Sequence, residues 1–127
     1  MEYLTLFTLF ILKHFLADFP LQTQRMVDEK GTYGREGGVT HAGIHGWFTM
    51  MIVMTFYITT KGWDVTAAGL MASLFGLLDA IIHYHIDWAK MRLGRGLTPT
   101  DRCFWILLGV DQMLHYLTYV LIIGLVL

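Results

Sequence analysis

Hydrophobic residues fill four long runs of the chain, which short polar segments separate. The runs cover residues 2–19, 39–60, about 65–88, and 98–127. A helix needs about 20 mostly apolar residues to cross the hydrocarbon core of a bilayer. The pattern therefore predicts an all-α integral membrane four-helix bundle, built as a single four-span domain of residues 1–127. No basic segment precedes the first run, so we expect it to be a helix of the protein rather than a cleaved signal peptide.

The polar segments differ in character. Residues 22–38 contain four glycines among polar side chains, which favours a long, mobile loop. Residues 61–64 are enough only for a tight turn, and residues 90–97 are basic and contain glycine. Thr98, Pro99 and Asp101 are typical of a helix N-cap, a first-turn proline and an acid near the positive end of the helix dipole. We expect the fourth helix to begin near Thr98 and to enter the membrane near Phe104.

The composition supports this class of protein. Hydrophobic residues make up 55% of the chain and charged residues 15%, and the mean hydropathy is +0.53. A soluble domain would carry about 25% charged residues. The net charge of −1 leaves no broad basic face for nucleic acid. Cys103 is the single cysteine, which excludes an internal disulfide and the usual structural zinc site.

The basic residues predict an orientation. Residues 22–38 and 90–97 each carry three, whereas the 61–64 turn has only Lys61. The positive-inside rule then places the first and third connections in the cytoplasm and both termini outside a bacterial inner membrane. We expect these bases to contact membrane lipids, and attraction of an anionic headgroup substrate is the alternative interpretation.

Histidine and aspartate side chains interrupt every apolar run at the same spacing. Residues four apart lie on one face of an α-helix. Each run contains one such pair: His14 and Asp18, His41 and His45, His83 and Asp87, and Asp111 and His115. Asp79 lies four residues before His83, whereas His85 points about 200° away from it. Polar groups in an apolar helix are costly, so we interpret the pairs as functional.

Four crossings in alternating directions bring all four pairs to the cytoplasmic side. At a rise of 1.5 Å per residue, one member of each pair lies roughly 8–10 Å below the cytoplasmic boundary. Asp79 and His115 lie deeper, at roughly 15 Å. Inward-facing residues at one level of a four-helix bundle build metal or cofactor sites. The sequence therefore predicts one shared site rather than four separate pairs.

Imidazole nitrogen and carboxylate oxygen together suit Zn²⁺, which we favour, and also Mn, Fe or Ni ions. The set is large enough for one or two ions. The expected metal ligands are His14, Asp18, His41, His45, His83, Asp87, Asp111 and His115. A metal ion with an open position lowers the pKa of bound water to about 7. We therefore expect a metal-dependent hydrolase acting on a lipid-like ester, phosphoester or amide at the cytoplasmic leaflet, with Asp79 and Asp111 as catalytic residues.

Several alternatives remain open. The same side chains suit a structural polar network or a transport path for protons or metal ions. Paired histidines can also ligate haem, although aspartates beside them are unexpected in that role. A non-catalytic accessory protein that binds other membrane proteins is a further alternative. Small residues at Gly69 and Ser73, and at Ala72 and Gly76, allow close helix packing within one chain or in a homo-oligomer.

Four segments resemble the motifs of a known family. They are His-Phe-Leu-Ala-Asp-Phe-Pro-Leu-Gln-Thr at 14–23, His-Ala-Gly-Ile-His at 41–45, His-Tyr-His-Ile-Asp-Trp-Ala-Lys at 83–90 and Asp-Gln-Met-Leu-His at 111–115. With them, most of the chain resembles a family of small polytopic membrane proteins of unknown function from bacteria and phages. The resemblance implies a four-span membrane protein, and its motif positions are His14, Asp18, Gln22, His41, His45, His83, Asp87, Lys90, Asp111, Gln112 and His115. A looser similarity links the chain to predicted membrane-bound metal-dependent hydrolases, whose His-Arg-x-x-Thr-His opening it lacks.

Overall fold

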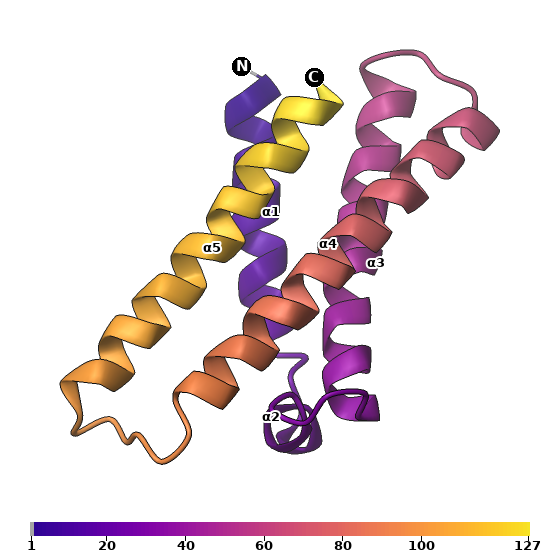
Figure 1. Ribbon diagram of the computed structural model, residues 1–127. Helices are drawn as coiled ribbons and strands as arrows, with labels where there is room; N and C mark the ends of the chain where they lie inside the picture. The colour runs from indigo at the N-terminus through magenta and orange to yellow at the C-terminus, as the bar shows by residue number, and fades with distance from the viewer. Residues whose placement is uncertain (1) are drawn as a thin grey trace.

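The computed structural model describes residues 2–127, which form helices and no strand. The helices are α1 (Glu2–Asp18), α2 (Gln24–Glu29), α3 (Glu36–Thr59), α4 (Val65–Leu93) and α5 (Arg102–Val126). The four long helices alternate in direction, so both termini lie at the same end of the molecule as the α3–α4 turn (Figure 1). We call this the terminal end; α2 and the α4–α5 loop lie at the opposite end, the α2 end. The all-α prediction is confirmed.

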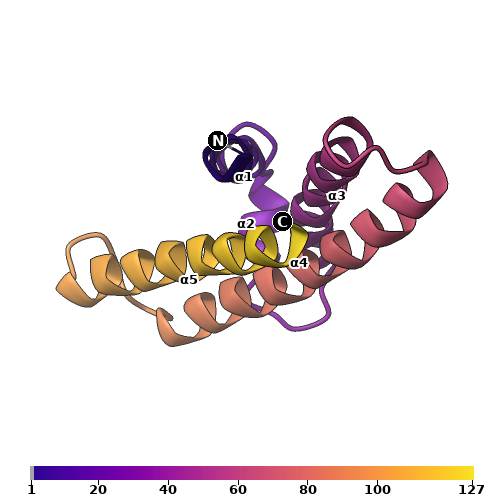
Figure 2. The same ribbon diagram turned by 90° about the horizontal axis from the view of Figure 1, so that it is seen from above.

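The long helices are not all parallel to one another. Seen from above, α1 is viewed nearly end-on, whereas α4 and α5 extend sideways across the molecule (Figure 2). Three helices are long and apolar enough to cross a membrane, namely α3 with 24 residues, α4 with 29 and α5 with 25. Helix α1 has 17 residues, at the lower limit of about 17–25 for a crossing. The crossing by α1, and with it the four-span count, stays a prediction.

Helices α3 and α4 touch through their backbones. A Cβ atom added to Gly46 would lie 2.4 Å from the Gly76 carbonyl oxygen, and one added to Gly76 would lie 2.6 Å from that of Gly46. Only glycine fits at this crossing unless the helices move apart. The expected tight turn between these helices is present, with Gly62 at a φ of +67°. The Asp64 side chain then caps α4 by accepting a hydrogen bond from the Thr66 N–H at 3.0 Å.

The segment expected to be a mobile loop contains a short helix instead. Helix α2 begins after Thr23, whose side chain accepts a hydrogen bond from the Met26 N–H. The Glu29 carboxylate accepts a 2.7 Å hydrogen bond from the Gly37 N–H at the start of α3, and Arg25 donates to its other oxygen at 3.2 Å. These two contacts lower the pKa of Glu29 below its usual range. The prediction of a mobile loop was based on glycine content, which does not reveal side-chain contacts of this kind.

Helix α5 begins later than expected. The Thr98 N–H and hydroxyl both donate to the Asp101 carboxylate, at 2.7 and 2.9 Å, and the Asp101 N–H donates to the Thr98 carbonyl at 2.9 Å. These bonds close residues 98–101 into a turn. Asp101 therefore occupies the N-cap position that the sequence pattern assigned to Thr98, and the helix starts at Arg102.

Apolar and polar side chains divide the interior of the bundle. The core at the terminal end is apolar and consists of Leu6, Phe10, Val53, Phe56, Tyr57, Ala68, Ala72, Tyr119, Ile122, Ile123 and Val126. Toward the α2 end the buried side chains are mostly histidine, aspartate and lysine. Large apolar side chains are exposed on all four long helices, for example Phe15, Met51, Leu77 and Leu117. This distribution is the reverse of that in a water-soluble protein and suits a surface in contact with lipid.

Candidate metal centre

Histidine and aspartate side chains from four helices meet in the polar half of the bundle. Every predicted metal ligand except Asp18 is buried, and Asp18 keeps 16% of its side chain exposed. The residues come from the end of α1, the start of α3, the end of α4 and the first half of α5. These helices alternate in direction (Figure 1), and their side chains bring the four pairs into contact with one another, as the sequence pattern predicted.

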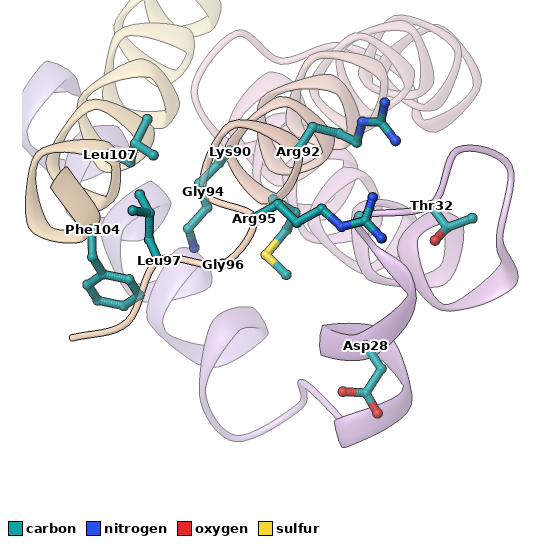
Figure 3. Close-up of a pocket in the computed structure, with 12 residues that line it drawn as sticks. Asp28, Thr32, Lys90, Arg92, Gly94, Arg95, Gly96, Leu97, Phe104 and Leu107 are labelled. Carbon is teal, nitrogen blue, oxygen red and sulfur yellow. The ribbon is translucent and has the colours of Figure 1, made fainter. Parts of the chain in front are cut away.

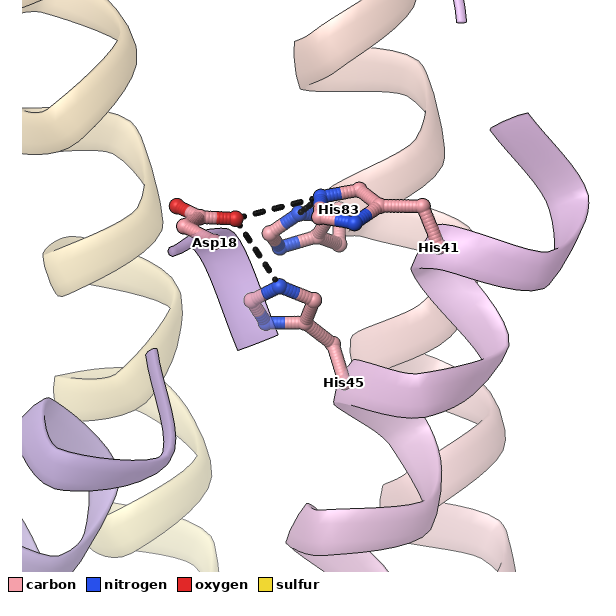
Figure 4. A group of neighbouring side chains, drawn as sticks. All are labelled: Asp18, His41, His45 and His83. Atoms are coloured by element: carbon pink, nitrogen blue, oxygen red, sulfur yellow. Dashed lines mark hydrogen bonds and ion pairs between the residues drawn. The ribbon is translucent and has the colours of Figure 1, made fainter. Parts of the chain in front are cut away.

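Four of these residues form a tight group that could hold a metal ion. Asp18, His41, His45 and His83 each offer one ligand atom, and these atoms all lie within 4.8 Å of one another. The Asp18 Oδ1 atom lies 3.1 Å from His41 Nε2 and 3.2 Å from His45 Nε2. The Nε2 atoms of His41 and His83 are 3.3 Å apart. Figure 4 shows the three rings and the carboxylate directed toward one point from α1, α3 and α4.

A second group shares a member with the first. His83, Asp87 and His115 also place ligand atoms within 4.8 Å of one another. The Asp87 carboxylate lies 3.6 Å from His83 Nε2 and 3.7 Å from His115 Nε2. However, Lys30 from the end of α2 places its ammonium 3.1 Å from Asp87 Oδ2. A positive charge therefore already neutralises the carboxylate of the second group.

The imidazole rings pack against one another across the helices. The His45 and His83 ring centroids are 3.6 Å apart with an interplanar angle of 24°, and those of His83 and His115 are 4.1 Å apart at 28°. Gly46 directly follows His45 in the sequence, and its close backbone contact with Gly76 holds α3 against α4. The ring positions thus depend on the glycine crossing as well as on helical spacing.

Two predicted ligands lie at the edge of these groups. His14 Nε2 is 2.9 Å from the Asp18 carboxylate, and its Nδ1 is hydrogen-bonded to the Tyr119 hydroxyl at 2.6 Å. Asp111 lies 3.5 Å from His115 Nε2 and 3.9 Å from the Lys90 ammonium. Neither residue belongs to a metal-ligand group among residues 2–127. His14 contacts Asp18 and Asp111 contacts His115, so each can orient a member of a group from outside it, as hydrogen-bonding side chains around metal ligands commonly do.

Asp79 lies deeper and has different partners. Its carboxylate forms an ion pair with Lys13 of α1 and accepts a 2.6 Å hydrogen bond from the Thr49 hydroxyl. The Lys13 ammonium also donates to the His45 carbonyl oxygen at 3.3 Å. The sequence pattern did not identify Lys13 and Lys30 as members of the polar cluster, and Lys30 was expected to contact membrane lipids with the other bases of residues 22–38. The one available signal was the position of Lys13 in the middle of an apolar run.

The remaining histidine faces away from the cluster. His85 is exposed on α4 and is hydrogen-bonded to the Ile81 carbonyl oxygen at 2.7 Å and to the Tyr33 hydroxyl at 3.1 Å. Its helical position had predicted this separation. His85 therefore takes no part in the site and is a suitable control position for substitutions of the other histidines.

Two features of the first group bear on cation binding. The Nδ1 atoms of His41, His45 and His83 are buried and have no hydrogen-bond partner among residues 2–127, so all three rings make their polar contacts through Nε2, at the shared centre. An ion held by the Nε2 atoms would leave these three Nδ1–H groups without a protein acceptor, unlike the usual metal-bound histidine. In addition, Asp79, Asp87 and Asp111 each have a lysine nearby, whereas Asp18 pairs only with histidines among the described residues. The first group thus combines three imidazole nitrogens with one carboxylate that forms no ion pair with a lysine among the described residues.

The spacing of the ligand atoms also fits. Bonds of about 2.0–2.2 Å to a tetrahedral ion separate its ligand atoms by about 3.3–3.6 Å. Three of the separations in the first group are 3.1, 3.2 and 3.3 Å, and all lie within 4.8 Å. Small adjustments of the side chains would therefore admit Zn²⁺ or an ion of similar size. The group lacks thiolates, so it differs from the usual structural zinc site.

The fold and the cluster define a class: an all-helical protein with helices apolar enough to cross a membrane and a buried His/Asp cluster that could hold a metal ion. Residues 6–127 match the family described as "Protein of unknown function (DUF3307)", and the chain belongs to this family. The expected membership of a family of unknown function is confirmed. No curated protein and no solved structure matches the chain.

Proposed function

We propose that this protein is a membrane-embedded metal-binding protein whose principal ion is held by Asp18, His41, His45 and His83. The observation that carries the proposal is the convergence of four ligand atoms from three helices within 4.8 Å of one another. Zn²⁺ is the preferred ion because the donors are imidazole nitrogen and carboxylate oxygen at tetrahedral spacing. We place the cluster near the cytoplasmic side of a bacterial inner membrane, with both termini outside, because the basic connections lie at the α2 end.

The chemistry we favour is hydrolysis of a lipid-like ester, phosphoester or amide. Four protein ligands would fill a tetrahedral site, so this chemistry requires water to displace one of them or to enter as a fifth ligand. Asp18 is the most exposed of the four, so this exchange is easiest on its side. With such a position, Zn²⁺ would supply an activated water near neutral pH. Asp111 is the better placed candidate proton acceptor, because it lies beside the cluster, 3.5 Å from His115 Nε2. Asp79 is the second candidate, although Lys13 and Thr49 already contact one of its oxygens.

Metal analysis tests the binding step. Protein purified without a histidine tag or chelator is expected to retain about one equivalent of transition metal, measured by plasma mass spectrometry. His83→Ala should lose most of the metal because His83 belongs to both groups. His85→Ala is the matched control and should keep it, since His85 lies on the exposed face of the same helix. Absence of metal from the wild type, or equal loss in both variants, would contradict the proposal.

Activity assays test the hydrolytic step. The metal-loaded protein is expected to hydrolyse a lipid ester, phosphoester or amide, and both chelation and His83→Ala should abolish the reaction. Asp111→Asn should lower the rate while the metal content stays unchanged. The transport alternative is less favoured because the buried core at the terminal end is apolar and offers few polar groups for a path. Metal flux into liposomes without any hydrolysis would favour transport over the hydrolase.

A further inference from the structure

A cleft of about 550 Å³ opens at the α2 end, between α2, the end of α4 and the start of α5 (Figure 3). Basic and apolar side chains line it together: Lys90, Arg92 and Arg95 with Leu97, Phe104 and Leu107. In Figure 3 the three apolar side chains lie on one side of the cleft, and the guanidinium groups of Arg92 and Arg95 extend toward the other. The cleft thus presents a polar, basic half and an apolar half.

The positive charge of the cleft is largely free. No ion pair of the described residues includes Arg92 or Arg95, and both side chains are exposed. Arg92 lies over the Trp88 ring at 6.0 Å, which leaves its charge available. Asp28 is the one acidic residue in the lining, against three bases. The balance favours an anionic ligand.

One lining residue connects the cleft to the polar cluster. The Lys90 ammonium lies 3.9 Å from the Asp111 carboxylate, which in turn lies 3.5 Å from His115 Nε2. Lys90 therefore forms part of the cleft wall and part of the outer edge of the cluster. A ligand held by Lys90 would lie beside the Asp111 side of the candidate metal centre.

We propose that this cleft binds the phosphate group of a membrane amphiphile, with the apolar chain along Phe104 and Leu107. Guanidinium and ammonium groups bind phosphate through charge-assisted hydrogen bonds. A small inorganic anion would make no use of the apolar half, whereas a phospholipid satisfies both halves at once. The cleft would then deliver such a lipid to the cluster through Lys90, and this last step rests on the proposed hydrolase. Basic residues that only set the membrane topology need neither a cleft nor an apolar wall. Basic residues outside the cleft therefore serve as the control in the test.

The test compares binding of three probes to the metal-containing full-length protein in a neutral detergent. The probes are short-chain phosphatidic acid, short-chain phosphatidylcholine and inorganic phosphate, measured by isothermal titration calorimetry. The Arg92→Gln/Arg95→Gln variant removes two charges from the cleft. The control, Arg35→Gln/Arg102→Gln, removes two exposed charges that do not line it. Metal content is measured on every sample.

Phosphatidic acid should bind the wild type more tightly than the other two probes. The cleft variant should weaken its binding roughly tenfold to thirtyfold, while the control variant stays within about twofold. Equal weakening in both variants would show general attraction to a basic surface and would overturn the proposal. Inorganic phosphate that binds as tightly as the lipid would overturn the assignment to an amphiphile. Selective lipid binding by a wild type that holds no metal would support the cleft while contradicting the proposed function.

Discussion

The buried ion pair between Lys13 and Asp79 provides the sharpest test of the polar interior. The two side chains are 2% and 1% exposed, and they join α1 to α4. The Thr49 hydroxyl and the His45 carbonyl oxygen supply the remaining hydrogen bonds. Each charge therefore depends on its partner, because neither is accessible to solvent. Removal of one partner leaves an uncompensated charge in a medium of low polarity.

Lys13→Met keeps the length of the side chain and removes its charge. Loss of one member of a buried pair costs about 3–5 kcal/mol of unfolding free energy, and Asp79→Leu should cost a similar amount. Independent effects would add to about 6–10 kcal/mol in the double variant. We expect the Lys13→Met/Asp79→Leu protein to lie within about 1 kcal/mol of the wild type instead, because replacement of a whole buried pair by apolar residues is often neutral.

The measurement is reversible unfolding by sodium dodecyl sulfate in mixed micelles, followed by tryptophan fluorescence. A double variant as unstable as the sum of the single variants would refute the reasoning, and so would a cost below about 1 kcal/mol for Lys13→Met. The double variant also separates two roles of Asp79. Hydrolysis that survives in a folded, metal-loaded double variant would make Asp79 a counter-ion rather than a catalytic residue.

Two further predictions use the same preparations. Gly46→Ala should destabilise the fold by about 3 kcal/mol or more and lower the metal content, because the new Cβ would lie 2.4 Å from the Gly76 carbonyl oxygen. Gly43→Ala, where nothing lies within 4 Å of the added atom, should be close to neutral in the unfolding assay, and equal effects would argue against a critical crossing. Lys30→Met should tighten metal binding to the cluster, measured by competition with a chelator, since it frees Asp87, whose Oδ2 atom lies 3.3 Å from His41 Nε2. An unchanged metal affinity would mean that Lys30 does not compete with an ion.

The pairs of polar residues could be found from the sequence because helical periodicity is local. Spacing alone placed His41 and His45 on one face of a helix and His85 away from its neighbours. The alternation of apolar runs then brought residues from different helices to one level. The start of the fourth long helix was predicted about three residues too early. The N–H and hydroxyl of Thr98 donate to the Asp101 carboxylate, so Thr98 belongs to a turn before the helix.

Helical spacing could not identify Lys13 and Lys30 as members of the cluster. Lys30 lies in a glycine-rich segment, and its partner Asp87 is 57 residues away. Lys13 pairs through its long side chain with Asp79, which is 66 residues away in the sequence. Long side chains can reach partners on several neighbouring helices, so helical spacing does not fix their contacts. The sequence therefore identified the acids and the imidazoles but not Lys13 and Lys30, the positive charges that pair with Asp79 and Asp87.

By itself, the sequence determined that the chain is helical, which runs are apolar, and which face of each helix carries histidine and aspartate. These properties follow from side-chain hydropathy and from the 3.6-residue helical repeat. Only the tertiary structure decided that Asp18, His41, His45 and His83 share one point, while Lys30 neutralises Asp87. That choice depends on how closely and at what angle the helices cross, and the crossing is set by contacts such as Gly46 against Gly76, which bring together residues far apart in the chain.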